Sequence, residues 1–534
     1  MEASAQTVSP ADDKLAPGTT MVLVAMALGV LVIANDFTAL NVALPSIEHD
    51  LNADIGTVQW VINAYTLTFG MAIVTGGRLA DLFGRRKVFF IGSAFFAVFS
   101  IAGAAAQGTG WLIGARVGMG IGGAMMWPAI LGMTFAALPE SRAGFAGALI
   151  LGCAGVGNAL GPLIGGALSE ASWRWIFVLN VPIAALAVWV TWLKVHQPAV
   201  DAGERRIDYA GIACLSLGLL LLLLGMDQAA DWGFGDPRVV GMFVLAAVLI
   251  VTFGFIEPRR GEVALIPRDI VRNFDFSAAC LTVLMMSAIF FASVLYVPQL
   301  MQKVLNYSPL ASGVGMLPML ALFAAVAFLS GRLYDRLGPK VVITAGALGL
   351  TAGPFAISLF QADSGYLVLV PGLVLLGIGA GLFYPSVTTA AVTALDPSRS
   401  SLAGGLVYMF QIAGGAIGLG LATTVFTTKS EGDVGADAAH VGIHLSDSQT
   451  AVVHGSLAGT DSGMEVIHQF PNSAAKLMQV VEGSFVAGVQ TAFYVIGGIA
   501  VAGLVISVLF VGGRLFGGPA GGEATEAIPA ADAA

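Results

Sequence analysis

The chain has 534 residues, of which 57% are hydrophobic and only 11% are charged, and its formal net charge is −9. So few charged residues cannot cover a soluble core of this size, which excludes a soluble globular protein and indicates that lipid is the main solvent of the chain. The negative balance argues against a nucleic-acid partner, although the distribution of charge along such a chain matters more than its sum.

The first twenty residues are polar and lack the basic start and cleavage site of a secretory signal, so we expect the first apolar segment to be retained. Fourteen apolar runs then follow, each long enough for a helix that crosses a bilayer. They predict an all-α polytopic membrane protein, and a broken helix would change the count by one or two. The runs begin near Met21, Val58, Lys87, Trp111, Ala143, Trp175, Tyr209, Val239, Phe276, Leu310, Val341, Tyr366, Ser401 and Phe485.

Lysine and arginine are distributed unevenly between the segments that connect these spans. Eighteen lie in segments on the side of the N-terminus, five lie on the other side, and one, Arg116, lies within a span. Because cytoplasmic loops are rich in Lys and Arg, and an even number of spans puts both ends on one side, both termini are predicted to be cytoplasmic.

The polar stretch at 429–483 is then predicted to lie outside the cell. His440 and His444 in this stretch have the i, i+4 spacing of one helix face, and two more histidines follow at 454 and 468. A metal site is possible, but histidines scattered through a solvated loop are the favoured interpretation, so no metal is expected. The three cysteines all fall inside apolar runs, so a disulfide framework is not expected.

The chain contains an internal repeat. The loop GGRLADLFGRRK at 76–87 and the loop SGRLYDRLGPK at 330–340, here called the first and second signature loops, align with a shift of 254 positions. At a shift of 257 positions, a second set of residues recurs. Its members are Pro128, Arg142, Gly147, Gly157 and Gly161, which recur as Pro385, Arg399, Gly404, Gly414 and Gly418.

The repeat predicts two six-helix bundles with two extra spans between them, as in transporters that are built from two similar halves. The expected parts are a cytoplasmic tail at 1–20, a first bundle at 21–197, the extra spans with cytoplasmic linkers at 198–272, a second bundle at 273–514 that includes 429–483, and a disordered cytoplasmic tail at 515–534.

Four motifs in this order resemble one transporter family. The first signature loop resembles the loop between helices 2 and 3 of the major facilitator superfamily, and DFTALNVALP at 36–45 is similar to the first-helix motif of its fourteen-span drug:proton antiporters. GVGNALGPLIGG at 155–166 resembles the fifth-helix antiporter motif, and WRWIFVLNVP at 173–182 resembles the start of helix six. The resemblance spans the whole chain and implies a major facilitator fold with fourteen spans, driven by a proton gradient and without a cofactor.

Asp36 and Arg116 are the candidate proton-coupling residues. An unpaired carboxylate in hydrocarbon costs several kcal/mol, so it tends to bind a proton or a partner. Asp36 lies about 12 Å from the outer end of its span and Arg116 about 9 Å from the outer end of its own, at 1.5 Å per residue. An ion pair is therefore feasible if spans 1 and 4 face each other, as they do in the resembled family. The alternative is a fixed salt bridge that only orients two helices.

The signature loops are candidate gates, which would hold the cytoplasmic side shut through contacts of Asp81 and Asp335. The alternative is a loop whose charges only determine topology. The candidate gate residues are Gly77, Arg78, Asp81, Gly84, Arg85 and Arg86 in the first loop, and Arg332, Asp335, Arg336, Gly338 and Lys340 in the second.

The antiporter motif contributes Gly157, Gly161, Pro162, Gly165 and Gly166. Three of these glycines are spaced by four and line one helix face, and Pro162 is expected to bend the helix. The resemblance implies that this face packs against the opposite bundle, and ordinary helix packing through small residues is the alternative.

Asp36 is the single carboxylate expected in the substrate path, which argues for neutral, monocationic or amphiphilic cargo. A substrate cavity needs apolar and aromatic side chains with a few polar ones. Candidates are Asn41, Asn63, Tyr65, Trp127, Asn158, Tyr296, Gln299, Tyr384, Tyr408, Gln411 and Gln490.

These observations predict a monomeric, proton-coupled exporter of hydrophobic or amphiphilic compounds in the cell membrane, with protons, membrane lipids and a lipophilic substrate as its partners. A dedicated exporter of a lipid, siderophore or metabolite is the alternative, and a transport-inactive sensor or scaffold is a more distant one. An enzyme is not expected, because the spans contain no metal-ligand cluster, serine–base pair or phosphate loop.

Overall fold

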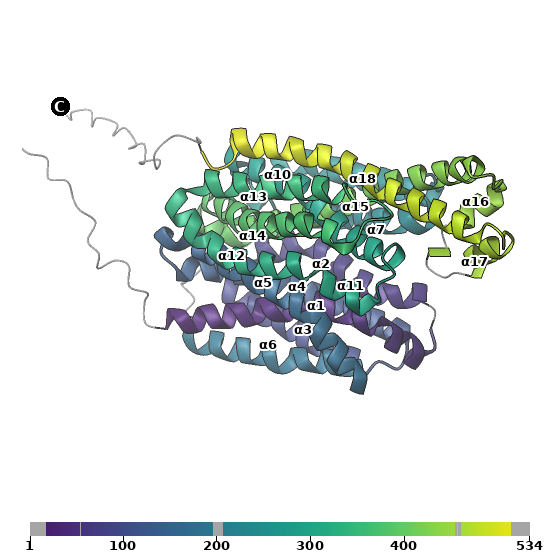
Figure 1. Cartoon of the computed structure of the whole chain (residues 1–534). Coiled ribbons are helices and arrows are strands. Elements are labelled where there is room, and N and C mark those ends of the chain that lie inside the picture. The colour runs from purple at the N-terminus through teal and green to yellow at the C-terminus, as the bar shows by residue number, and fades with distance from the viewer. Residues whose placement is uncertain (1–17, 54, 196–206, 454–455, 458–460, 514–534) are drawn as a thin grey trace, which may run out of the picture.

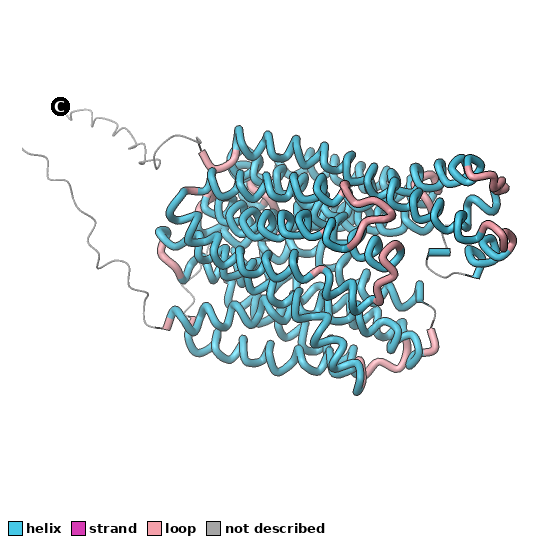
Figure 2. Tube along the Cα trace, viewed as in Figure 1, coloured by secondary structure: helices cyan, strands magenta, loops and turns pink. Residues whose placement is uncertain are grey.

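The computed structural model describes residues 18–53, 55–195, 207–453, 456–457 and 461–513. The tails expected at 1–20 and 515–534 therefore lie almost entirely outside the described residues. Within the described part the chain is helical and contains no strand (Figure 2). Fourteen of the described helices are long and apolar enough to cross a membrane, which confirms the predicted fold class.

The first half consists of six long helices, which lie side by side (Figure 1). Glycine separates the second from the third, because Gly84 has a φ of +99°, a conformation that favours glycine and ends a helix. The helices are α1 (Thr19–Leu51), α2 (Ile55–Phe83), α3 (Arg85–Ala104), α4 (Thr109–Ala137), α5 (Ala143–Ala171) and α6 (Arg174–Lys194).

The second half repeats this arrangement. Gly338, the counterpart of Gly84, has a φ of +82° and separates α12 from α13. The main helices are α10 (Phe274–Lys303), α12 (Leu317–Leu337), α13 (Pro339–Ile357), α14 (Val370–Thr393), α15 (Ser400–His440) and α18 (Ala474–Phe510), with the short α11 (Pro309–Gly315) before α12. Their packing matches that of the first half: α1 packs on α5 and α6 as α10 does on α15 and α18, and α2 packs on α4 as α12 does on α14.

The two bundles meet along crossed pairs of helices. From the first bundle, α5 packs against α12 and α14, and from the second, α15 packs against α2 and α4. The extra spans α7 (Tyr209–Trp232) and α8 (Pro237–Ile256) form a hairpin, of which α7 packs against both α2 and α15. The hairpin therefore lies beside the interface of the two bundles. The short α9 (Arg268–Arg272) leads from it to α10.

Most predicted spans begin within four residues of the helices found, and two differ more. The tenth, expected near Leu310, begins at Leu317, because Ser308 caps the separate helix α11 before it. The fourteenth, expected near Phe485, begins at Ala474. Polarity marks where lipid contact ends, but a helix can continue into water when one of its faces is packed.

The stretch at 429–483 is largely helical in its described part. The end of α15, the short helices α16 (Asp447–Val453) and α17 (Asp461–His468) and the start of α18 form a cap that projects from one end of the bundles (Figure 1). The cap has a small apolar core that includes Val434, Ile443 and Leu477. Since α15 ends at His440, that residue and His444 do not share a helix, and the described residues contain no group of three or more metal-ligating side chains.

Candidate functional site

A buried ion pair joins α1 to α4. Asp36 and Arg116 are both 0% exposed, and Nη1 of the arginine donates to Oδ2 of the aspartate. Nε of Arg116 donates to the carbonyl oxygen of Val61 at 2.8 Å, which fixes the guanidinium against α2. Helices α2 and α4 approach closely because α4 has a glycine at the contact: at Gly120 a Cβ would lie 2.7 Å from the carbonyl oxygen of Tyr65 on α2. The structure thus contains the ion pair that the matching depths made feasible.

The carboxylate of Asp36 has a second partner that sequence reasoning missed. Asn180 on α6 donates from Nδ2 to Oδ1 of Asp36 at 3.0 Å and is itself 0% exposed. Ser100 on α3 lies 3.4 Å from the same Nδ2 and donates to the carbonyl oxygen of Phe177 at 2.8 Å. Five helices, α1, α2, α3, α4 and α6, therefore contribute to one polar network. Asn180 belongs to the motif WRWIFVLNVP, and a lone amide inside an apolar span was the signal that could have identified it.

An aromatic cluster lies beside the network and reaches across the bundle interface. The guanidinium of Arg116 lies 4.2 Å from the ring centre of Tyr65, a cation–π contact. Phe69 lies 5.9 Å from Tyr65 and 5.7 Å from Tyr408 of the second bundle, whose ring is 4.5 Å from that of Trp127. The predicted cavity residues Tyr65, Trp127 and Tyr408 are thus brought together, and Phe69 was missed because only polar aromatic residues were considered.

Two polar atoms in this cluster are buried without a partner among the described residues. They are Oη of Tyr65 and Nε1 of Trp127. Buried polar groups are normally hydrogen-bonded, so each of these is available to an acceptor or donor on a bound molecule. Both belong to the first bundle. Trp127 contacts Tyr408 of the second bundle directly, and Tyr65 contacts it through Phe69.

The first signature loop contacts the opposite bundle through Asp81. Its Oδ2 accepts from the backbone N of Leu402 at 2.8 Å and its Oδ1 from that of Ser401 at 3.3 Å, so the carboxylate caps the first turn of α15. Arg85 donates to Asp81 at 3.3 Å and to the carbonyl oxygen of Pro397 at 2.6 Å. A carboxylate at a helix N-terminus is favourable because the backbone N–H groups there are unpaired and the helix dipole is positive.

The second signature loop makes the mirrored contact. Asp335 on α12 accepts from the backbone N of Gly144, in the first turn of α5, at 3.1 Å. Since α5 and α15 are counterparts in the repeat, each loop aspartate caps the equivalent helix of the other bundle. The contact is weaker than that of Asp81, because Asp335 accepts one such bond and is exposed.

The other gate candidates differ in what they contact. Gly77 allows close approach to α15, since a Cβ there would lie 2.8 Å from the carbonyl oxygen of Ser401. Arg86 donates to the carbonyl oxygen of Trp192 within its own bundle. In the second loop, Arg332 and Arg336 are exposed on α12 with no hydrogen bond or ion pair to the first bundle in the part of the chain described, and Lys340 is buried near the end of α18.

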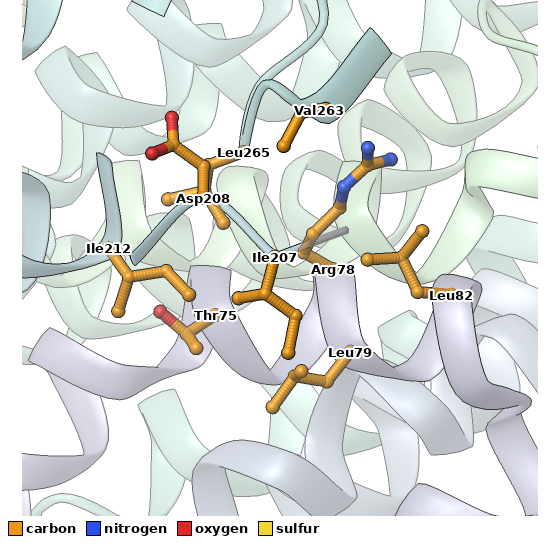
Figure 3. A pocket seen from close by; sticks show the side chains of 9 residues that line it. All are labelled: Thr75, Arg78, Leu79, Leu82, Ile207, Asp208, Ile212, Val263 and Leu265. Atoms are coloured by element: carbon orange, nitrogen blue, oxygen red, sulfur yellow. The ribbon is translucent and has the colours of Figure 1, made fainter. Parts of the chain in front are cut away.

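Arg78 points toward a small cavity between α2 and the base of the α7–α8 hairpin (Figure 3). Asp208, Ile212 and Leu265 line the other side of this cavity. The first signature loop therefore contacts the extra spans as well as the second bundle. Nearby, Arg399 at the start of α15 pairs with Asp269 of α9 and holds the pKa of that carboxyl below its usual value.

The glycine face of the antiporter motif lies against α1 and not against the opposite bundle. A Cβ at Gly157 would lie 2.8 Å from Ala34, and one at Gly165 would lie 2.1 Å from the carbonyl oxygen of Ala39. The expectation for this face was wrong because residues 155 and 157 lie about 200° apart around a helix, and Gly155 is the one that faces Ala324 of α12. Gly161 lies on the face toward α1 and Gly166 is half-buried, whereas the side chain of Pro162 lies outside the described residues.

The remaining cavity candidates do not form one site. Asn41 is exposed, Tyr296 donates to Thr423 at 3.0 Å, and Gln490 donates to the carbonyl oxygen of Phe360 at 2.8 Å. Tyr384 is hydrogen-bonded with Ser287 at 3.2 Å in the second bundle. Asn158, Gln299 and Gln411 are half-buried on α5, α10 and α15.

A second carboxylate within the spans was missed. Asp227 on α7 accepts from Nδ2 of Asn63 on α2 at 3.0 Å, which links the hairpin to the first bundle. It also accepts from Gln228 at 3.1 Å. Asp227 is half-buried, and sequence reasoning missed it because the extra spans were treated as a connection and not as part of the helix packing.

Comparisons with known proteins agree on one family. The family model described as Major Facilitator Superfamily matches residues 26–419. The chain is 30% identical over 496 residues to the tetracenomycin C resistance and export protein of Streptomyces glaucescens, covering 91% of this chain and 90% of that protein. It is 33% identical over 449 residues to the puromycin resistance protein of Streptomyces alboniger, covering 83% and 86%. The structure of the human organic anion transporter MFSD10 matches with a TM-score of 0.61 over 92% of this chain and 100% of that one, at 15% identity, which shows the fold alone.

Proposed function

The chain belongs to the Major Facilitator Superfamily, a family of membrane transporters and not of enzymes, and we propose that it is a proton-coupled antiporter that exports hydrophobic or amphiphilic compounds. The observation that carries the proposal is the fully buried carboxylate of Asp36, held by Arg116 and Asn180. Export is supported by the names of relatives, which describe antibiotic resistance and export.

In the proposed mechanism, Asp36 exchanges a proton for the substrate. The charged form is stabilised by the guanidinium of Arg116 and the amide of Asn180, because hydrogen bonds to an ionised group are the strong ones. A proton that neutralises Asp36 removes most of the attraction to Arg116 and leaves that cation beside Tyr65. The protonation state of Asp36 would then change the electrostatic environment of the aromatic cluster at the bundle interface.

Alternating access would use the two aspartate caps. The caps join the bundles at the end where α2 meets α3, and we assign this end to the cytoplasm because the signature loops are rich in Lys and Arg. The conformation described is then the one closed toward the cytoplasm. Opening requires both caps to break, so that α5 and α15 separate from the opposite bundle at this end.

The substrate is proposed to bind at the aromatic cluster. Tyr65, Phe69, Trp127 and Tyr408 offer ring faces, while the unpartnered Tyr65 Oη and Trp127 Nε1 offer two polar contacts. Such a site fits a compound that is mostly apolar with a few polar groups. The protein would act as a monomer in the cell membrane, with both termini in the cytoplasm.

The test uses everted membrane vesicles with a pH gradient, screened with lipophilic cations and lipids for substrate-induced proton release. The wild type is expected to couple export to proton release, and Asp36→Asn to lose coupling at normal protein levels. Asp50→Asn is the matched control, because Asp50 lies on the same helix but is exposed and paired with Arg174. Retained coupling in Asp36→Asn would contradict the proposal, and release by lipids alone would identify a lipid exporter.

A further inference from the structure

Two acidic side chains meet at the base of the α7–α8 hairpin, and the proposed transport mechanism uses neither. Asp208 caps α7, and its Oδ1 accepts from the backbone N of Gly211 at 2.9 Å. Glu257 directly follows α8, and its Oε1 accepts from the backbone N of Ile266 at 2.6 Å. Each residue is only 5% exposed. One oxygen of each carboxyl group is therefore held in place by the backbone.

The other two oxygens converge on the same point. Asp208 Oδ2 and Glu257 Oε2 are both buried and have no hydrogen-bond partner among the described residues when both groups are taken as ionised. A Cβ at Gly211 would lie 2.7 Å from the first and 2.8 Å from the second, so both oxygens lie against the same side of Gly211. Ionised carboxylates only accept, so a hydrogen bond between them requires a proton on one.

The surrounding charges do not neutralise two carboxylates. The guanidinium of Arg260 lies 3.7 Å from Asp208, but its side chain is 47% exposed and its charge is screened by water. The charge of Arg78 interacts with Asp81 and Asp269 as well as with Glu257, so it is not dedicated to the pair. Among the described residues, the cations that interact with the pair are Arg260, which follows α8 and lies against Asp208, and Arg78 on α2. Two adjacent buried carboxyl groups avoid a double negative charge by keeping one proton.

We propose that Asp208 and Glu257 form one proton-binding site, in which a single buried proton bridges Asp208 Oδ2 and Glu257 Oε2. When the proton leaves to water, the net charge of the pair changes from −1 to −2 and the two groups repel. Asp208 lines the cavity that Thr75, Arg78 and Leu79 of α2 also line, next to the first signature loop (Figure 3). The bound proton therefore holds the two ends of the hairpin together at the point where they contact α2.

The site is distinct from Asp36 and does not depend on antiport, so its first test is spectroscopic. Infrared difference spectra of the purified protein in lipid nanodiscs are recorded as the pH is raised, and they report the loss of protonated carboxyl groups. One component is expected to disappear in the wild type, and its midpoint should fall by at least about one pH unit in both Asp208→Asn and Glu257→Gln, because each removes the like charge.

Asp236→Asn is the matched control for this titration. Asp236 caps α8 as Asp208 caps α7, but it is accessible to water and paired with Arg238. It should leave the component unchanged. The proposal is overturned if the wild type shows no such component, or if the component titrates in Asp208→Asn and Glu257→Gln at the same pH as in the wild type.

Thermal unfolding gives a second, independent readout. A proton bound only in the folded state stabilises at low pH, and this contribution is lost as the pH rises through the titration of the pair. The amide introduced by Glu257→Gln can donate a hydrogen bond at every pH. The Tm of Glu257→Gln relative to that of the wild type should therefore increase as the pH rises. If Glu257→Gln fails to fold, the same measurement is made on Asp208→Asn, because Asn caps a helix as well as Asp does. Parallel Tm curves for the wild type and both variants would also overturn the proposal.

Discussion

At the residue scale, the network around Asp36 shows how a charge is kept in an apolar bundle. Removing one partner of a buried ion pair costs about 3–5 kcal/mol, because the other charge is left uncompensated. Here Arg116 makes a further bond to the backbone of α2, and Asn180 satisfies the second carboxylate oxygen. The charged state of Asp36 is thus supported from three helices. Asn180 should therefore affect proton exchange without contacting the substrate.

The first prediction tests this positioning role of Asn180. Asn180→Leu removes a hydrogen bond to an ionised group, which is worth about 1.5–3 kcal/mol. Transport should become slower and its pH profile should change, because the ionised form of Asp36 loses one of its hydrogen-bond donors. Thr191→Val on the same helix is the control, since Thr191 is buried but bonds only to its own helix. An unchanged pH profile in Asn180→Leu would show that the amide is only structural.

The second prediction concerns pH and the ion pair between Asp269 and Arg399. The hydrogen bond from Arg399 lowers the pKa of Asp269. A lowered pKa means that the pair stabilises the fold at neutral pH and loses this effect as the pH falls below about 4. The Tm of Asp269→Asn should thus lie below that of the wild type at neutral pH and approach it in acid. The difference should be small, since the carboxylate is exposed, and should shrink at high salt.

The matched control for Asp269 is Asp363→Asn, an exposed acid in the loop after α13. Its Tm difference from the wild type should be the same at neutral and acidic pH. If the two variants behave alike across the pH range, the ion pair contributes nothing to stability.

At the element scale, α5 and α15 make two kinds of contact, on different faces and at different depths. Close to their first turns they accept the aspartate caps of the opposite bundle. Further along, the glycine face of α5 packs on α1 near Asp36. The end of α5 that would move on opening is therefore continuous with the face that supports the proton-coupling residue. This continuity gives a physical link between the network and the closed end of the bundles.

The third prediction compares the two caps. Asp81 accepts two backbone bonds and is 5% exposed, whereas Asp335 accepts one and is exposed. A charge at a helix N-terminus is worth up to about 2 kcal/mol when partly buried. Asp81→Ala should therefore slow transport about tenfold or more while substrate binding is kept, and Asp335→Ala should have the smaller effect. Transport and equilibrium binding in proteoliposomes separate the two quantities, and normal turnover in Asp81→Ala would reject the gate.

At the scale of the whole molecule, the α7–α8 hairpin contacts the first bundle at both of its ends. Asp227 bonds with Asn63 of α2 near one end, and the cavity at the other end joins Asp208 to the residues around Arg78. Toward α15 the hairpin presents apolar side chains among its described residues, such as Met226 against Gly420. Apolar surfaces slide more easily than hydrogen-bonded ones, so the hairpin should move with the first bundle.

The fourth prediction tests this with disulfide cross-links in a background without the three native cysteines. A cross-link between cysteines at Gly70 and Leu223 joins α2 to α7, and transport should be retained. A cross-link between cysteines at Gly420 and Met226 joins α15 to α7, and transport should stop until a reductant is added. Both pairs are in contact in the structure, which makes them matched. Equal inhibition by the two cross-links would show that the hairpin does not follow the first bundle.

Much of the fold could be predicted from the sequence, because lipid imposes simple rules. Each span needs a continuous apolar helix, so the fourteen spans are visible as runs of apolar residues. The repeat is visible because glycine and charge are needed at the same places in both halves, as at Gly84 and Gly338 with their positive φ. The ion pair of Asp36 with Arg116 was predictable from their matching depths together with the neighbouring spans 1 and 4 of the resembled family, since charged groups in hydrocarbon pair with each other.

The tertiary structure decided what spacing along the chain cannot. Asn180 joined the network, Asp227 paired with Asn63, and Asp208 met Glu257 only because helices distant in sequence pack together. The partners of Asp81 and Asp335 are backbone N–H groups at helix ends, which carry no sequence signature of their own. The apolar runs and the internal repeat determined a duplicated helical membrane protein, and the motifs indicated its transporter family. Packing determined which faces and polar atoms meet, because those contacts depend on the rotation and depth of each helix.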